Sequence, residues 1–241
     1  PTSGYIFNTN NSPFNSTAEF ENLKEEDYNS TFSFMEEENN RSIRFMELID
    51  EYEKLSYEDF KEIKYDQQYP YSILYIGNIS QIFDLDKSEF PNYENLIDLI
   101  QKWDRRGDIE NIGAAQWSLY YSYMLDVLSE NDLSVKDTID IKFHLDALEK
   151  TKDRLMKNFG KLDIRLGDIQ RLVRGDKSLP VSGLIDMIAP TYSVPMEGGK
   201  VRAVSGESYI MLIKYSEDGP EVETILPYGN SSNPSSPHYT D

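Results

Sequence analysis

The pattern of apolar and polar positions divides the chain into three regions. Residues 1–31 are rich in Asn, Ser and Thr and keep no apolar period, which predicts loops. Residues 32–159 repeat apolar side chains every three or four positions, which is typical of amphipathic helices. In residues 160–241, Gly and Pro become frequent and short apolar runs predict strands. We therefore predict an α+β chain: a loop segment with an entry strand over residues 1–31, a helical region over 32–159 and a C-terminal β region over 160–241.

Several stretches of the middle region carry helix signals. We expect the apolar segment that contains Trp117 to pack against the stripe that ends at Trp103, because each needs an apolar partner. Trp103 should then be buried. In chain order the signals are a stripe over 45–55, a capping box at Ser56-Tyr57-Glu58-Asp59, an apolar segment over 73–83, a stripe over 93–103, an almost wholly apolar segment over 114–128, and a cap at Ser134-Val135-Lys136-Asp137 for a helix ending near Gly160.

Three strands are predicted near the end of the chain, over residues 200–204, 209–215 and 222–226. Asp218-Gly219 has the composition of a turn between the last two strands. The run over 209–213 is continuously apolar, which is typical of a strand covered on both faces. Three strands are too few to complete such a sheet, so we expect partner strands outside this chain.

The net charge of −19 narrows the choice of partners. An acidic surface repels phosphate backbones and anionic lipid, so we expect neither nucleic acid nor membrane as a partner. No apolar run approaches the roughly 18 residues that would cross a bilayer. The chain has no cysteine and two histidines, which excludes disulfides and makes a histidine-based metal cluster improbable.

The usual catalytic groups give no clear site. His144 lies in a helical pattern, where we expect a helix-surface or core-edge residue, and nothing marks His238 as a base. Glu36-Glu37-Glu38 is most simply a solvated helix start. Glycines such as Gly206 lack the Lys-Ser/Thr that completes a phosphate loop. No cofactor or metal is assigned.

The opening segment contains four asparagines and no charged side chain within residues 1–15. A neutral amide such as that of Asn10 can stabilise a developing oxyanion without adding a titrating group. The same Asn-Asn-Ser-Pro text is also good turn chemistry. From these residues alone, both interpretations of Asn10 remain open.

Five segments, taken in order, resemble one family. Within the last of these segments, Asn230 departs from the pattern of that family, because its members usually carry Gln at this position. The segments are Gly4-Tyr5-Ile6-Phe7-Asn8-Thr9-Asn10-Asn11-Ser12-Pro13, Arg41-Ser42-Ile43-Arg44, Leu99-Ile100-x-x-Trp103-Asp104, the stretch from Leu166-Gly167-Asp168-Ile169-Gln170-Arg171 to Ser182-Gly183, and the stretch from Gly206-Glu207-Ser208-Tyr209 to Ser236-Pro237-His238-Tyr239-x-Asp241. They are similar to the penicillin acylase (penicillin amidase) family of N-terminal-nucleophile hydrolases, and fit the acyl-homoserine lactone and aculeacin-type branch best.

The resemblance implies a fold and roles for two residues. The fold is an αββα sandwich, left incomplete by this chain. Asn10 matches the family's oxyanion-hole donor, and Arg41 matches an active-site arginine that supports it. The simpler alternative for Arg41 is a salt bridge at a helix start with Glu37 or Glu38.

In the family, autoproteolysis of the precursor exposes a serine at the start of the β chain. This serine is the nucleophile, and its own α-amine serves as base. Pro1 cannot replace that serine, and Ser3, Ser12 and Ser16 do not begin a chain. We therefore expect the C-terminal part of a β chain, inactive without the upstream part. A calcium ligand near Glu19 or Glu21, as in penicillin acylases proper, is not assigned.

These expectations define a periplasmic or secreted amidase that cleaves linear amides of small N-acyl compounds, of β-lactam or acyl-homoserine lactone type. Its partner is the remainder of the same precursor, meaning the α chain and the N-terminal part of the β chain. The alternative is a non-catalytic helical domain that binds a ligand or protein and merely shares turn-rich loops.

Overall fold

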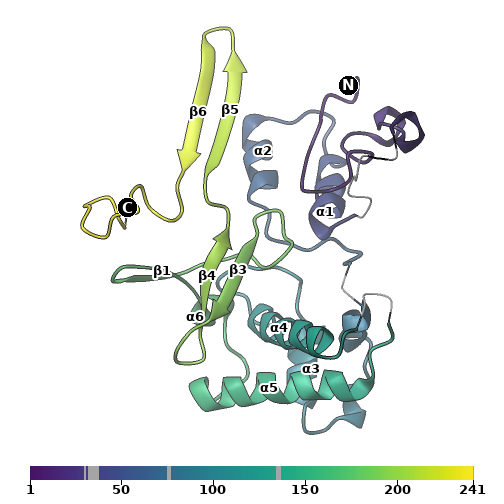
Figure 1. The fold of residues 1–241 in the computed structure, drawn as a ribbon, viewed down its shortest axis with the longest axis vertical. Coiled ribbons are helices and arrows are strands. Elements are labelled where there is room, and N and C mark those ends of the chain that lie inside the picture. Colours follow the sequence, from purple (N-terminus) through teal and green to yellow (C-terminus); the bar gives the residue numbers. More distant parts are fainter. Residues whose placement is uncertain (30, 32–37, 75–76, 134–136, 241) are drawn as a thin grey trace. The chain divides into compact units, whose positions relative to one another are not determined.

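In a computed structural model, the chain is described for residues 1–29, 31, 38–74, 77–133 and 137–240 (Figure 1). It forms two compact units. The first contains Pro1–Leu74 together with Asp186–Ile188, and the second contains Tyr75–Ile185 and Ala189–Asp241. Helices and strands occur together, which confirms the α+β class.

The first unit starts with the predicted loop segment, whose described residues (1–29 and 31) form two short 3₁₀ turns, η1 (Glu19–Glu21) and η2 (Glu25–Asp27), and not the expected entry strand. Two helices follow, α1 (Asn40–Ile49) and α2 (Tyr57–Lys64). The loop packs on α1 through aromatic rings, with the centroids of Phe7 and Phe45 4.3 Å apart. The apolar part of the opening segment therefore fastens it to the helix, and its polar part is left to form a loop.

Side chains fix where these two helices begin. The capping box at Ser56 and Asp59 is confirmed, and Asn39 and Ser42 form an equivalent box at the start of α1. The predicted stripe over 45–55 is too long, because α1 ends at Ile49. Asp50 and Glu51 follow at once, and acidic side chains are unfavourable at a helix C-terminus.

The second unit is built on helices that pack together (Figure 1). Trp103 is 5% exposed and its ring stacks on Trp117 at 5.8 Å, which confirms the predicted contact. Among the described helices, none has the length and apolar character needed to cross a membrane. The helices are η3 (Gly77–Phe83), η4 (Lys87–Glu89), α3 (Glu94–Gln101), α4 (Ala114–Glu130), α5 (Ile141–Phe159) and α6 (Leu166–Ile169).

Three helix predictions for this unit need correction. The segment over 73–83 is helical only as the 3₁₀ helix η3, and residues 75–76 lie outside the described residues. The cap of α5 is Asp140, whose carboxylate accepts from the backbone N–H of Lys142; the proposed cap residues 134–136 lie outside the described residues. His144 is fully buried rather than at a surface or core edge. The helix does end at Gly160, at φ 71°.

The second unit also holds a four-stranded sheet in the order β2-β1-β4-β3, in which β1 and β4 run parallel and the other pairs antiparallel. Only β4 was predicted. Periodicity does not reveal the first two strands, because Arg171 and Arg174 flank the short apolar run of β1 and β2 is exposed along its whole length. The strands are β1 (Gln170–Arg174), β2 (Lys177–Pro180), β3 (Thr191–Pro195) and β4 (Val201–Gly206).

The last two strands, β5 (Ile210–Ser216) and β6 (Gly219–Ile225), form the predicted antiparallel hairpin (Figure 1). Its turn ends at Gly219, at φ 114°. Burial alternates only at the start of β5, where Ile210 and Leu212 are buried and Met211 is 49% exposed; the last three residues of the strand are all exposed. Within this chain, the first half of the strand is therefore covered on one face and not on both. Whether strands outside the chain cover the other face stays a prediction.

Candidate active site

Asparagine side chains shape the loop that contains Asn10. Asn8 Oδ1 accepts the backbone N–H of Asn10 at 2.8 Å, and Asn11 Oδ1 accepts that of Thr9 at 2.8 Å. These bonds suit asparagine, which folds back onto the backbone two residues away. Asn10 itself has φ 63°, in the left-handed region that Asn tolerates better than most residues. Asn11 is buried beneath the loop and Asn10 is exposed on it.

Arg41 orients the side chain of Asn10. Arg41 Nη1 donates to Asn10 Oδ1 at 2.8 Å. Because a guanidinium has only donors, the oxygen end of the amide must face it, and the nitrogen end faces away. Within the described part of the chain, Asn10 Nδ2 makes no hydrogen bond. The result is an exposed N–H donor with a fixed orientation and no internal acceptor.

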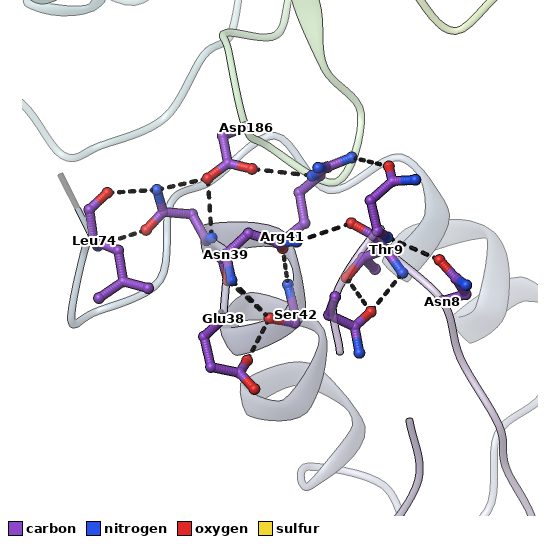
Figure 2. Close-up of polar contacts among 11 residues, drawn as sticks. Asn8, Thr9, Glu38, Asn39, Arg41, Ser42, Leu74 and Asp186 are labelled. Atoms are coloured by element: carbon purple, nitrogen blue, oxygen red, sulfur yellow. Dashed lines mark hydrogen bonds and ion pairs between the residues drawn. The ribbon is translucent and has the colours of Figure 1, made fainter. Parts of the chain in front are cut away.

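Asp186 in turn holds Arg41 from the opposite side. Its Oδ1 accepts from Arg41 Nε at 3.0 Å, and the two side chains are 27% and 19% exposed. Its Oδ2 accepts from the backbone N–H and from Nδ2 of Asn40, at 3.0 and 2.9 Å. Figure 2 shows Asp186 between the backbone at the start of α1 and the side chain of Arg41.

The start of α1 is also tied to its surroundings. Asn39 Nδ2 donates to the carbonyl of Thr9 at 3.1 Å, which links the helix cap to the Asn10 loop (Figure 2). Asn40 exchanges two hydrogen bonds with the backbone of Leu74, at 2.8 and 2.6 Å. The loop, the helix start and Asp186 therefore form one polar network within the first unit.

Sequence reasoning selected Asn10 and Arg41 and missed Asp186. The structure brings these three residues together. An available signal was the sequence Leu184-Ile185-Asp186-Met187-Ile188, in which one acid interrupts an apolar run and needs a partner. The alternative partner Glu38 instead accepts from Ser42 Oγ at 2.6 Å, and Glu37 lies outside the described residues.

The three serines of the opening segment serve the loop. Ser3 Oγ bonds Thr17 Oγ1 at 2.9 Å, Ser12 Oγ accepts the backbone N–H of Phe14, and Ser16 Oγ donates to the carbonyl of Ser12. Each hydroxyl thus has a local backbone or hydroxyl partner. Nothing in this arrangement activates one of them as a nucleophile.

The titratable groups of Glu21 and His144 do not take part in the hydrogen bonds around Asn10 within the described residues. Hydrogen bonds from Ser3 and Thr2 lower the pKa of Glu21 to about 2. Across the residues that the structure describes, no three His, Asp or Glu side chains are grouped so as to hold a metal. Both histidines belong to the second unit, where burial lowers the pKa of His144 to about 4.

The chemistry available here is electrostatic. A neutral amide donor, backed by a guanidinium on its oxygen, is polarised so that its N–H donates more strongly. It adds no proton equilibrium of its own, and the oriented N–H suits an acceptor that gains negative charge during a reaction.

Comparison with known proteins identifies a family for this chain. The penicillin amidase family model matches residues 1–241. An acyl-homoserine lactone acylase, PvdQ, of Pseudomonas fluorescens is 37% identical over 82 residues, which cover 33% of this chain and 11% of that protein. PvdQ of Pseudomonas syringae pv. tomato is 26% identical over 160 residues, covering 59% of this chain and 21% of the relative.

The chain thus spans between about a tenth and a fifth of the length of these relatives. The family match extends over every segment that suggested the resemblance, including the Asn10 loop and the C-terminal hairpin. It shows an acylase and amidase family of hydrolases. The chain belongs to the penicillin amidase family.

Proposed function

We propose that this chain is part of an amide hydrolase of the N-terminal-nucleophile type, in which Asn10 donates Nδ2–H to the oxyanion. The observation that carries this proposal is the bond from Arg41 Nη1 to Asn10 Oδ1, at 2.8 Å. That bond fixes which end of the amide points outward. A turn residue would not need a guanidinium on its side-chain oxygen.

The proposed reaction transfers the acyl group twice. A serine hydroxyl, supplied by another part of the same precursor, attacks the amide carbon while its own α-amine takes the proton. The C–N bond then breaks, the amine leaves with that proton, and water hydrolyses the acyl-serine. In both steps the carbonyl oxygen gains charge, and removing one oxyanion donor typically costs about 3–4 kcal/mol of barrier.

The proposed substrates are small N-acyl compounds with a linear amide and an apolar acyl chain, of β-lactam or acyl-homoserine lactone type. The support is the family match and the names of the relatives, which are acyl-homoserine lactone acylases. The proposal includes a periplasmic or secreted location and, as partner, the remainder of the same precursor. This chain by itself should then be inactive.

Hydrolysis of a chromogenic N-acyl amide by the complete, processed enzyme tests the proposal. Asn10→Ala should lower kcat about 10²–10³-fold and change KM much less, since the donor acts mostly as charge develops. An unchanged kcat would leave Asn10 as a turn residue only. Turnover by the isolated 241-residue chain would overturn the claim that the nucleophile lies elsewhere.

Two control variants separate the donor from the loop. Asn8→Ala removes the acceptor for the backbone N–H of Asn10, and should lower kcat less than Asn10→Ala does. Asn29→Ala removes an exposed asparagine with the same kind of bond, to the N–H of Thr31 at 2.9 Å, and should leave kcat unchanged. A loss in Asn29→Ala equal to that in Asn10→Ala would point to a general effect of asparagine removal.

A further inference from the structure

The carboxylate of Asp186 serves two functions in the polar network. It lies 145 residues after Arg41 in sequence, yet it accepts from Arg41 Nε and from two donors of Asn40. One oxygen faces the arginine and the other faces the first turn of α1. Asp186 therefore sets the distance and angle between the helix start and the guanidinium.

This arrangement determines how Arg41 can lie. An arginine side chain has several rotatable bonds, and one hydrogen bond to Asn10 leaves the guanidinium plane free to turn. A second bond, from Nε to Asp186 Oδ1, fixes that plane because the donors of a guanidinium have a rigid relative geometry. With the plane fixed, Nη1 has one direction in which to donate.

The backbone at Asp186 supports the same conclusion. Asp186 has φ 62°, in the left-handed region that is unfavourable for most side chains. Its Oδ2 lies at the N-terminus of α1, where a negative charge is favoured by the helix dipole and by free N–H groups. The hydrogen bonds from Asn40 therefore hold the carboxylate at the start of the helix independently of Arg41.

We propose that Asp186 is a positioning residue for the oxyanion donor: it holds the guanidinium of Arg41 against the first turn of α1, the helix that carries Arg41, and the guanidinium then orients the amide of Asn10. This inference rests on the proposed function of Asn10. It adds a residue that reaches the reacting atoms only through two others. Its loss should therefore impair the reaction without removing any group that touches the substrate.

The test uses Asp186→Asn in the complete, processed enzyme. The amide has nearly the same shape, but one of its ends is a donor and must face either Arg41 Nε or the donors of Asn40. We expect kcat to fall about 10–100-fold and KM to stay within about threefold, because the donor is misaimed rather than absent. A kcat equal to the wild type would overturn the proposal.

A double-mutant cycle distinguishes positioning from general damage. If Asp186 acts through Asn10, then Asp186→Asn should have almost no further effect on kcat once Asn10→Ala is present. A merely structural role would instead multiply the two losses. Multiplied losses would overturn the positioning role while leaving the proposed function of Asn10 intact, whereas an unchanged kcat in Asn10→Ala alone would remove the proposed function.

Matched variants guard against misfolding. Asp66→Asn removes a carboxylate that pairs with Arg44, which lies in α1 as Arg41 does. Asp66 accepts from Arg44 Nε and Nη2 at 3.0 Å each and makes no hydrogen bond to Asn10 within the described residues. It should lower thermal stability and leave kcat unchanged; an equal kcat loss would overturn the proposal. If Asp186→Asn does not fold, Asp186→Glu keeps the charge one methylene further out. The kcat of Asp186→Glu should fall while its KM stays unchanged. In the double variant with Asn10→Ala, kcat should fall no further than in Asn10→Ala alone, and any other pattern contradicts the proposal.

Discussion

The two units of the chain are stabilised in different ways. The first is organised around polar side chains: Asn10, Arg41 and Asp186 are joined by hydrogen bonds that connect distant parts of the sequence. The second is organised around apolar helices, in which Trp117 and Tyr120 are almost completely buried. Its core also contains buried polar bonds, among them the bond between Tyr120 Oη and His144 Nδ1, at 2.5 Å, and the bond from Gln116 Nε2 to the carbonyl of Ile164, at 3.2 Å.

The two kinds of interaction contribute differently to the protein. Apolar burial is non-directional, so it stabilises the second unit without fixing individual donor angles. Hydrogen bonds are directional and give little net stability each, but they fix the orientation of a side chain. Substitutions in the helical unit should therefore change stability before rate, and substitutions in the polar network should change rate before stability.

The largest expected effect on stability lies in the helical unit. Trp117→Ala should lower the free energy of unfolding by about 3–5 kcal/mol, because it removes a buried ring and leaves a cavity. The kcat of the folded enzyme should not change. Chemical denaturation checks the stability, and Phe20→Ala, at a ring 77% exposed in this chain, is the control with a small effect. A kcat loss in Trp117→Ala without unfolding would erase the contrast between the units.

A smaller effect concerns the pH dependence of the helical unit. Burial lowers the pKa of His144 to about 4, below its ordinary value of 6.5. The unfolded chain therefore binds a proton more readily, and stability should fall as pH drops from about 6.5 to about 4, by about 3 kcal/mol in all. His144→Gln should flatten this part of the curve.

A comparison of His144→Gln with the wild type decides whether His144 is responsible. If the variant unfolds with the same pH dependence as the wild type, burial of a neutral His144 is not what makes the helical unit sensitive to acid.

The smallest effects come from the helix caps of the first unit. Ser56→Ala and Asn39→Ala each remove a cap and should each lower stability by about 1 kcal/mol. Only Asn39 also donates to the carbonyl of Thr9. Thermal melting should show equal losses of stability in the two variants, and kcat should fall in Asn39→Ala alone. An equal kcat in both variants would mean that the cap of α1 does not support the Asn10 loop.

Much of the helical unit could be predicted from the sequence. Periodicity located α3 and α4 and their contact through Trp103, because burial of an apolar stripe is a local signal. It did not locate β1 or β2, which carry charged or exposed side chains and take their structure from strand pairing. It misplaced the start of α5, since several acidic and hydroxyl residues before Ile141 are plausible caps.

The candidate site was only partly predictable. Asn10 and Arg41 were found through motifs that resemble a family, and their roles stay proposals. Asp186 was not found, because its partners are 145 and 146 residues away and no local pattern encodes such a contact. Its one signal was chemical: a single carboxylate in an apolar run.

The most direct test of the central claim compares two inhibitors of the complete enzyme. An acyl-chain boronic acid forms a tetrahedral anion with the nucleophile, whereas the product carboxylic acid carries no such adduct. Asn10→Ala should weaken boronate binding about 10²–10³-fold and product binding by less than about threefold, since an oxyanion donor binds the charged tetrahedral state best. Boronate binding as tight as in the wild type would contradict the assignment of Asn10 as the oxyanion donor.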